Sequence, residues 1–138
     1  MSHSGGYWAT AIMATKGGVE TSEVHLLDSL YGYESTFQDW IEQEPAKYAT
    51  TPPQRRFFSV YTAGGGTDDN NIAMANGAKS WAWFDQSARV HDDTTATWTP
   101  DQYLHGAMWK RSGLSHSGVV LYYFQQLIQT SPLLVDKP

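Results

Sequence analysis

The 138-residue sequence contains no cysteine, and this absence removes several kinds of site at once. Disulfide bonds, thiolate metal sites and a cysteine nucleophile are all excluded. Long apolar runs are also missing, because no stretch reaches the length that a membrane-spanning helix needs. The first residues lack the basic and apolar regions of a signal peptide, so a cytoplasmic location is the default expectation.

Positive charge is scarce in this chain. Nine Lys and Arg residues face fourteen Asp and Glu residues, the formal net charge is −5, and the longest basic run is Arg55–Arg56. This balance argues against a nucleic-acid or anionic-membrane partner. Hydrophobic residues make up 41% of the chain and aromatic residues 14%, which predicts a single globular domain over residues 1–138.

Helical and strand patterns alternate along the chain. Apolar and β-branched residues predict strands at Val24–Asp28 and Arg56–Thr62, and a weaker one at Ala107–Trp109. Such alternation favours an α/β fold, with a mostly parallel sheet flanked by helices. Apolar residues at helical spacing predict the first three helices at Tyr7–Ala14, at a short stretch around Trp40 and at Ile72–Lys79.

The last helix is predicted from a run of apolar residues at helical spacing. Ser117 is placed to cap its start, and Ser131–Pro132 marks its end. Residues 80–100 carry no clear period and are expected to be largely irregular. The predicted buried face of the helix consists of Val120, Tyr123, Phe124, Leu127 and Ile128.

The chain begins with a candidate catalytic serine. Ser2-His3-Ser4-Gly5-Gly6 has the pattern of a nucleophile elbow, G-x-S-x-G, with serine in place of the first glycine. An elbow follows a strand, but only one residue stands before the motif. If Ser4 is the nucleophile, the backbone N–H of Gly5 would be one donor to the oxyanion, because it opens a helix.

A serine nucleophile needs a base, and the base needs an acid that orients it. Asp28 closes the first predicted strand, and His116 lies in the loop before the last helix. The carboxyl ends of parallel strands meet at one edge of a sheet, so Ser4, Asp28 and His116 are expected to lie together there. They occur in the chain order Ser, Asp, His.

Other residues compete for these roles. Asp68 or Asp69, which follow the next predicted strand, could replace Asp28 as the acid, although capping of the helix near Ile72 explains one of them. We favour Asp28, because a carboxylate that ends an apolar strand usually has a partner. Ser117 repeats the motif in Ser115-His116-Ser117-Gly118 but lacks the closing glycine.

Other features of the sequence are weaker indications of function. His3 adjoins Ser4, but neighbours across such a turn point apart, so His3 is not predicted as the base. The spacing of His91, Asp92, Asp93 and His105 does not support a metal site, and neither a metal nor a cofactor is predicted. Six Trp and eight Tyr could provide a surface for stacking sugars, or could equally serve a core.

Three patches resemble the C-terminal half of an α/β-hydrolase, and together they span nearly the whole chain. The patches are Ser2-His3-Ser4-Gly5-Gly6-Tyr7, Val24 to Gly32 and Ser115-His116-Ser117. Uncharacterised bacterial members with a His-Ser-Gly-Gly elbow are the most similar. The resemblance implies a serine esterase, lipase or amidase. It also implies that the earlier half of the fold, with a second oxyanion donor, is missing, as in a fragment.

Two hypotheses follow for function. In the first, the chain is a serine hydrolase: Ser4 attacks a small-molecule ester or amide, His116 is the general base, Asp28 orients His116 and Gly5 stabilises the oxyanion. In the second, it is a non-catalytic remnant of a hydrolase that acts as an interaction or binding module. A half-sheet would expose a strand edge, which favours self-association.

Overall fold

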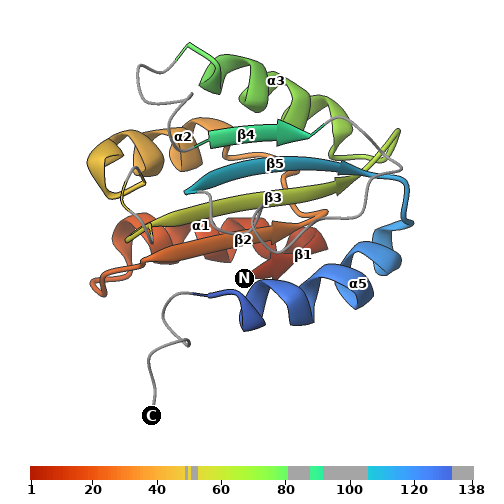
Figure 1. Ribbon diagram of the computed structural model, residues 1–138, viewed down its shortest axis with the longest axis horizontal. Helices are drawn as coiled ribbons and strands as arrows, with labels where there is room; N and C mark the ends of the chain where they lie inside the picture. Colours follow the sequence, from red (N-terminus) through yellow and green to blue (C-terminus); the bar gives the residue numbers. More distant parts are fainter. Residues whose placement is uncertain (49, 51–52, 81–87, 92–105, 132–138) are drawn as a thin grey trace.

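The computed structural model describes residues 1–48, 50, 53–80, 88–91 and 106–131. They form a parallel sheet with helices on both faces, so the predicted α/β fold class is confirmed (Figure 1). The spatial order of the strands is β1-β2-β3-β5-β4, and each neighbouring pair is parallel. The strands are β1 (Ser2–His3), β2 (Glu23–Leu27), β3 (Arg56–Thr62), β4 (Ala88–His91) and β5 (Ala107–Ser112).

The helices divide unequally between the two faces of the sheet. The apolar cluster on one face includes residues of α1 (Tyr7–Lys16), α2 (Glu34–Glu42) and α3 (Asp68–Ala78). The other face is covered by α5 (His116–Gln129), which runs along the lower front of the sheet in Figure 1. Within the described part of the chain, no helix is both long and apolar enough to cross a bilayer.

The central strand β3 supplies side chains to both layers of the core. Phe57 and Tyr61 pack with α1 to α3, whereas Phe58 and Val60 pack with α5. All four side chains are fully buried, and burial of each such side chain is worth about 1.5–3 kcal/mol. This explains why Arg56–Thr62, with its dense aromatic and β-branched content, is found with the bounds that its sequence predicts.

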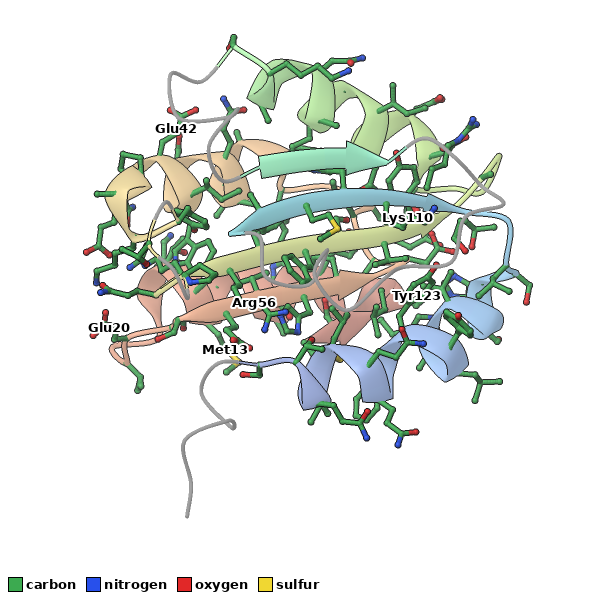
Figure 2. All side chains as sticks on the ribbon, viewed as in Figure 1. Met13, Glu20, Glu42, Arg56, Lys110 and Tyr123 are labelled. Atoms are coloured by element: carbon green, nitrogen blue, oxygen red, sulfur yellow. The ribbon has the colours of Figure 1, made fainter. Side chains whose placement is uncertain are left out.

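The face beneath α5 also contains charged groups. Arg56 is fully buried, donates to the carbonyl of Thr130 at 2.8 Å and lies over the ring of Phe58, with 4.4 Å from Cζ to the ring centroid. Figure 2 shows Arg56 beside the sheet and Tyr123 on α5. The Glu23 carboxylate, 3.4 Å from Arg56, partners this buried charge.

Two predicted features of the helices are corrected. The helix expected from Ile72 begins four residues earlier, at Asp68, because a turn from Gly65 O to Asp68 N starts it and two acidic residues suit its first turn. The last helix is capped by Ser115, which accepts from Gly118 N at 3.2 Å, and not by Ser117. His116 is therefore the first residue of α5 and not part of the preceding loop.

The buried face of α5 is narrower than the sequence suggests. The row that faces the sheet is Val119, Tyr123 and Leu127, four residues apart, whereas Phe124 is 47% exposed and Ile128 is 38% exposed. The wider predicted stripe therefore faces the sheet only in part. Residues 80–100 were expected to be largely irregular. Within them, residues 88–91 form strand β4, and residues 81–87 and 92–100 lie outside the described ranges.

Candidate functional site

A strand does lead into the elbow, although it is short. Ser2 and His3 pair in parallel with Leu26 and Leu27 of β2. The chain then turns sharply, so that Ser4 has a φ of 52° and a short 3-10 turn, Ser4–Gly6, continues into α1. Side chains other than glycine rarely adopt this backbone region, and strain of this kind gathers at functional sites.

The serine that replaces the first glycine of the motif fits this turn. A Cβ placed on Gly6 would lie 3.0 Å from the Cβ of Ser2, so only one of the two positions has room for a side chain. Ser2 is buried, and its hydroxyl lies 3.0 Å from that of Ser29. The departure from G-x-S-x-G is thus compensated by Gly6 and is compatible with an elbow.

Asp28 and His116 meet at the carboxyl edge of the sheet. Nδ1 of His116 lies 2.7 Å from Oδ2 of Asp28, although 88 positions separate the two residues in the chain. An ionised carboxylate only accepts hydrogen bonds, so Nδ1 carries the proton and donates it. The neutral ring then has its lone pair on Nε2, the nitrogen that a general base uses. The side chain of His116 is 40% exposed and Asp28 is buried.

Asp28 is held by several donors. The hydroxyl of Thr62 donates to it at 2.8 Å and the N–H of Thr62 at 3.3 Å, and the hydroxyl of Thr67 donates a further short hydrogen bond. Burial alone would raise the pKa of Asp28. The hydrogen bonds from Thr67, His116 and Thr62 outweigh burial and hold this pKa below its ordinary value. The carboxylate therefore stays ionised beside the histidine at neutral pH.

Ser4 is linked to this pair only through its neighbours in the described structure, Ser29 and His3. Ser29, which follows Asp28, donates to the carbonyl of Ser4 at 2.7 Å and so ties the elbow to β2. Among the described residues, no hydrogen bond joins the Ser4 hydroxyl to the His116 ring. The ring of His3, the neighbour of Ser4, packs on that of His116 with 4.2 Å between centroids. His3 thus contacts the histidine of the site, which the sequence did not indicate.

The competing carboxylates are engaged elsewhere or exposed. Asp68 accepts two hydrogen bonds from Arg111, at 3.0 and 2.7 Å, and another from Gly64 N at 2.7 Å. Arg111 is the first cause that lowers the pKa of Asp68. Asp69 is exposed on α3. Neither bonds to His116 in the described structure, whereas Asp28 does.

Of the remaining candidates, Gly5 adjoins Ser4 and Ser117 does not. Ser117 is exposed within α5, whereas Gly5 is exposed in the 3-10 turn Ser4–Gly6, and α1 begins only at Tyr7, so the expected position of Gly5 at the start of a helix is corrected to the turn before it. Asp92, Asp93 and His105 lie outside the described residues, as does the side chain of His91. The two threonines that hold Asp28 were missed by the sequence reading. Their signal was position, because Thr62 ends β3 at the same edge.

Comparison of the chain with protein-family models, with curated proteins and with solved structures finds no match in any of the three. The fold itself is an α/β fold with a parallel sheet, which holds a strained turn at Ser4 and a hydrogen-bonded histidine–aspartate pair. A function therefore has to be argued from these residues.

Proposed function

We propose that this protein is a serine hydrolase that cleaves an ester or amide bond through an acyl-enzyme. The observation that carries the proposal is the 2.7 Å hydrogen bond between His116 and Asp28, formed beside the strained turn that holds Ser4. The order Ser4, Asp28, His116 and their place at the carboxyl ends of parallel strands agree with a hydrolase of the α/β-hydrolase type.

Each residue has one role in the proposed reaction. The Ser4 hydroxyl attacks the carbonyl carbon while its proton passes to Nε2 of His116, and Asp28 stabilises the imidazolium that results. The N–H of Gly5 donates to the oxyanion of the tetrahedral intermediate. Collapse of this intermediate breaks the bond to the leaving group, which takes the proton from His116. Water then attacks the acyl-enzyme in the same way and releases the acid.

The missing contact between serine and histidine is consistent with this mechanism. In enzymes without substrate, catalytic hydrogen bonds are often long and shorten only when substrate is bound. The His116 side chain is partly exposed, which leaves its ring freedom to turn toward Ser4. The contact with His3, the residue before Ser4, and the bond to Asp28 hold the ring at this edge of the sheet.

A fluorophosphonate probe tests the nucleophile directly, because it reacts covalently with an activated serine. We expect the wild type and Ser117→Ala to be labelled, Ser4→Ala not to be labelled, and His116→Ala to be labelled far more slowly. Ser117→Ala is the matched control, since it removes an exposed serine from the same Ser-His-Ser-Gly sequence. Labelling that persists in Ser4→Ala contradicts the assignment, and absence of labelling in the wild type contradicts the proposed activity.

The second candidate function is an interaction module, and the exposed surface near β1 favours it. β1 is at the edge of the described sheet and pairs only with β2. On α1, which follows β1, Trp8 is 54% exposed and Met13 is 66% exposed. An unpaired strand edge beside exposed apolar side chains is a site for association with another chain.

Sedimentation over a wide range of protein concentration tests this candidate. We expect the wild type to self-associate and Met13→Lys to shift the equilibrium toward monomer, because a charge would be desolvated in the contact. Val19→Lys is the control, since Val19 is 77% exposed and lies beyond the end of α1. A wild type that stays monomeric at every concentration rules out self-association through this edge.

A further inference from the structure

Three tyrosines form a cluster beside the candidate site. They belong to neither apolar core cluster and have no role in the proposed mechanism. Tyr7 is the first residue of α1, directly after the elbow, and Tyr31 and Tyr33 lie in the loop that follows Asp28. The ring centroid of Tyr7 lies 6.1 Å from that of Tyr31 and 6.0 Å from that of Tyr33. We call these three residues the tyrosine cluster.

The cluster lies close to the proposed catalytic groups. Burial and then the negative charge of Asp28 raise the pKa of Tyr31, so the phenol and the carboxylate are near enough to interact. The loop after β3 accommodates the same ring, because a Cβ on Gly66 would lie 3.0 Å from Cε1 of Tyr31. The glycine run that ends at Gly66 thus leaves room for the tyrosine beside Asp28.

Much aromatic surface of the cluster stays in solvent. Tyr31 is 40% exposed and Tyr33 is 41% exposed, even though the residues between the end of β2 and Tyr31 are buried. Tyr33 keeps this position with a φ of 66°, a backbone region that bulky residues rarely adopt. Such rings next to a nucleophile can contribute binding surface to a substrate.

We propose that the tyrosine cluster binds an aryl group of the substrate, which deepens the proposed hydrolase function and rests on it. The three rings are tilted, with interplanar angles of 44° and 57° to Tyr7, so they offer both edges and faces. Aromatic rings prefer edge-to-face and offset contacts with one another.

Matched thioesters test the preference, because the members of each pair are similar in size and differ in aromatic character, and dividing each rate by that of hydroxide hydrolysis corrects for intrinsic reactivity. One pair is the phenylacetyl and cyclohexylacetyl thioesters of ethanethiol; the other is the acetyl thioesters of benzyl mercaptan and cyclohexylmethanethiol. We expect the aryl member of at least one pair to have a kcat/KM higher by about tenfold. Equal rates in both pairs, or a preference for the cyclohexyl compounds, overturn the inference.

Variants of one tyrosine separate the ring from the hydroxyl. We expect Tyr31→Leu to abolish the preference and Tyr31→Phe to retain it, since only the first removes the ring. Tyr122→Leu is the control, because Tyr122 has the same 40% exposure and lies on α5 outside the cluster. A preference that survives in Tyr31→Leu and in Tyr7→Leu contradicts the role of the cluster.

Binding without turnover distinguishes failure of this inference from failure of the hydrolase proposal. Methyl phenylacetate and methyl cyclohexylacetate are titrated into Ser4→Ala protein, and saturation-transfer NMR follows the ligand. We expect stronger transfer to the aryl ligand, reduced by adding Tyr31→Leu to the Ser4→Ala protein. If the aryl ligand shows stronger transfer but the fluorophosphonate probe does not label the wild type, the hydrolase proposal is overturned and the aryl site is retained. Equal transfer to both ligands overturns the aryl site.

Discussion

Asp28→Asn is expected to slow fluorophosphonate labelling of Ser4 by about 10³- to 10⁴-fold. Asn cannot keep His116 in the tautomer with its proton on Nδ1, because an amide offers that nitrogen a donor as readily as an acceptor. The substitution adds no backbone strain. Asp28 has a φ of 47°, and Asn is among the side chains that tolerate this region best. The loss therefore reports the carboxylate and not a distorted turn.

The same variant should remain folded. Loss of the charge weakens the hydrogen bonds from two threonines and His116, which predicts a fall in the free energy of unfolding of about 1–3 kcal/mol. Urea unfolding measures this fall, and labelling is compared under conditions where each protein is native. Asp69→Asn is the control, because it removes an exposed carboxylate from the neighbouring helix. Unchanged labelling of Asp28→Asn would exclude Asp28 as the orienting acid.

Acid is expected to destabilise the protein through His25, which lies on β2 beneath α5. Burial and then the positive charge of Arg56 lower the pKa of His25 from 6.5 to about 3. The unfolded chain takes up this proton below about pH 6.5, whereas the folded protein takes it up only near pH 3. The contribution of neutral His25 to the free energy of unfolding is therefore fully present above pH 6.5 and is lost progressively as the pH falls toward 3. The free energy of unfolding is expected to fall by about 3 kcal/mol between pH 6.5 and pH 4.

The contacts of His25 support the neutral form. Its Nε2 lies 3.6 Å from Oε2 of Glu23, which is too long for a hydrogen bond, and its ring stacks on Phe58 with 5.5 Å between centroids. Glu23 is shared with Arg56, whose positive charge opposes protonation of the histidine. Burial and the positive charge of Arg56 therefore outweigh the nearby carboxylate and keep His25 neutral.

His25→Leu tests this assignment, because leucine has a similar volume and cannot take up a proton. Urea unfolding at pH 7 and pH 4 gives the loss of stability for each protein. We expect the loss in the variant to be smaller than that in the wild type by about 3 kcal/mol. Parallel losses in the two proteins would show that other groups cause the acid sensitivity.

The sequence predicted most of the sheet because its strands are marked by their own residues. The run from Arg56 to Thr62 is apolar and aromatic throughout and has no competing helical period, so its bounds agree with β3. β4 was missed because strand residues 88–91 stand in a stretch rich in tryptophan, aspartate and threonine, where no period is visible. Helix starts were less well predicted, since Ser115 and Ser117 offer the same capping chemistry.

The site was predictable only to the extent that position along a parallel sheet determines it. Strand ends brought Ser4, Asp28 and His116 to one edge, and the hydrogen bond between the last two agrees with that reasoning. The stacking of His3 on His116 depends on how a sharp turn directs a side chain, which residue order does not reveal. The tilt of the tyrosine rings could not be predicted either, because it depends on the conformation of the loop that holds Tyr31 and Tyr33.

The long span between Asp28 and His116 also bears on folding kinetics. We expect a contact across 88 positions to close only after β2, β3 and β5 have come together, because parallel pairings of this kind form slowly. The histidine–aspartate pair is therefore assembled late, whereas the elbow needs only β1 and β2. If Ser4 is the nucleophile as proposed, a serine-directed probe applied during refolding would then follow completion of the sheet.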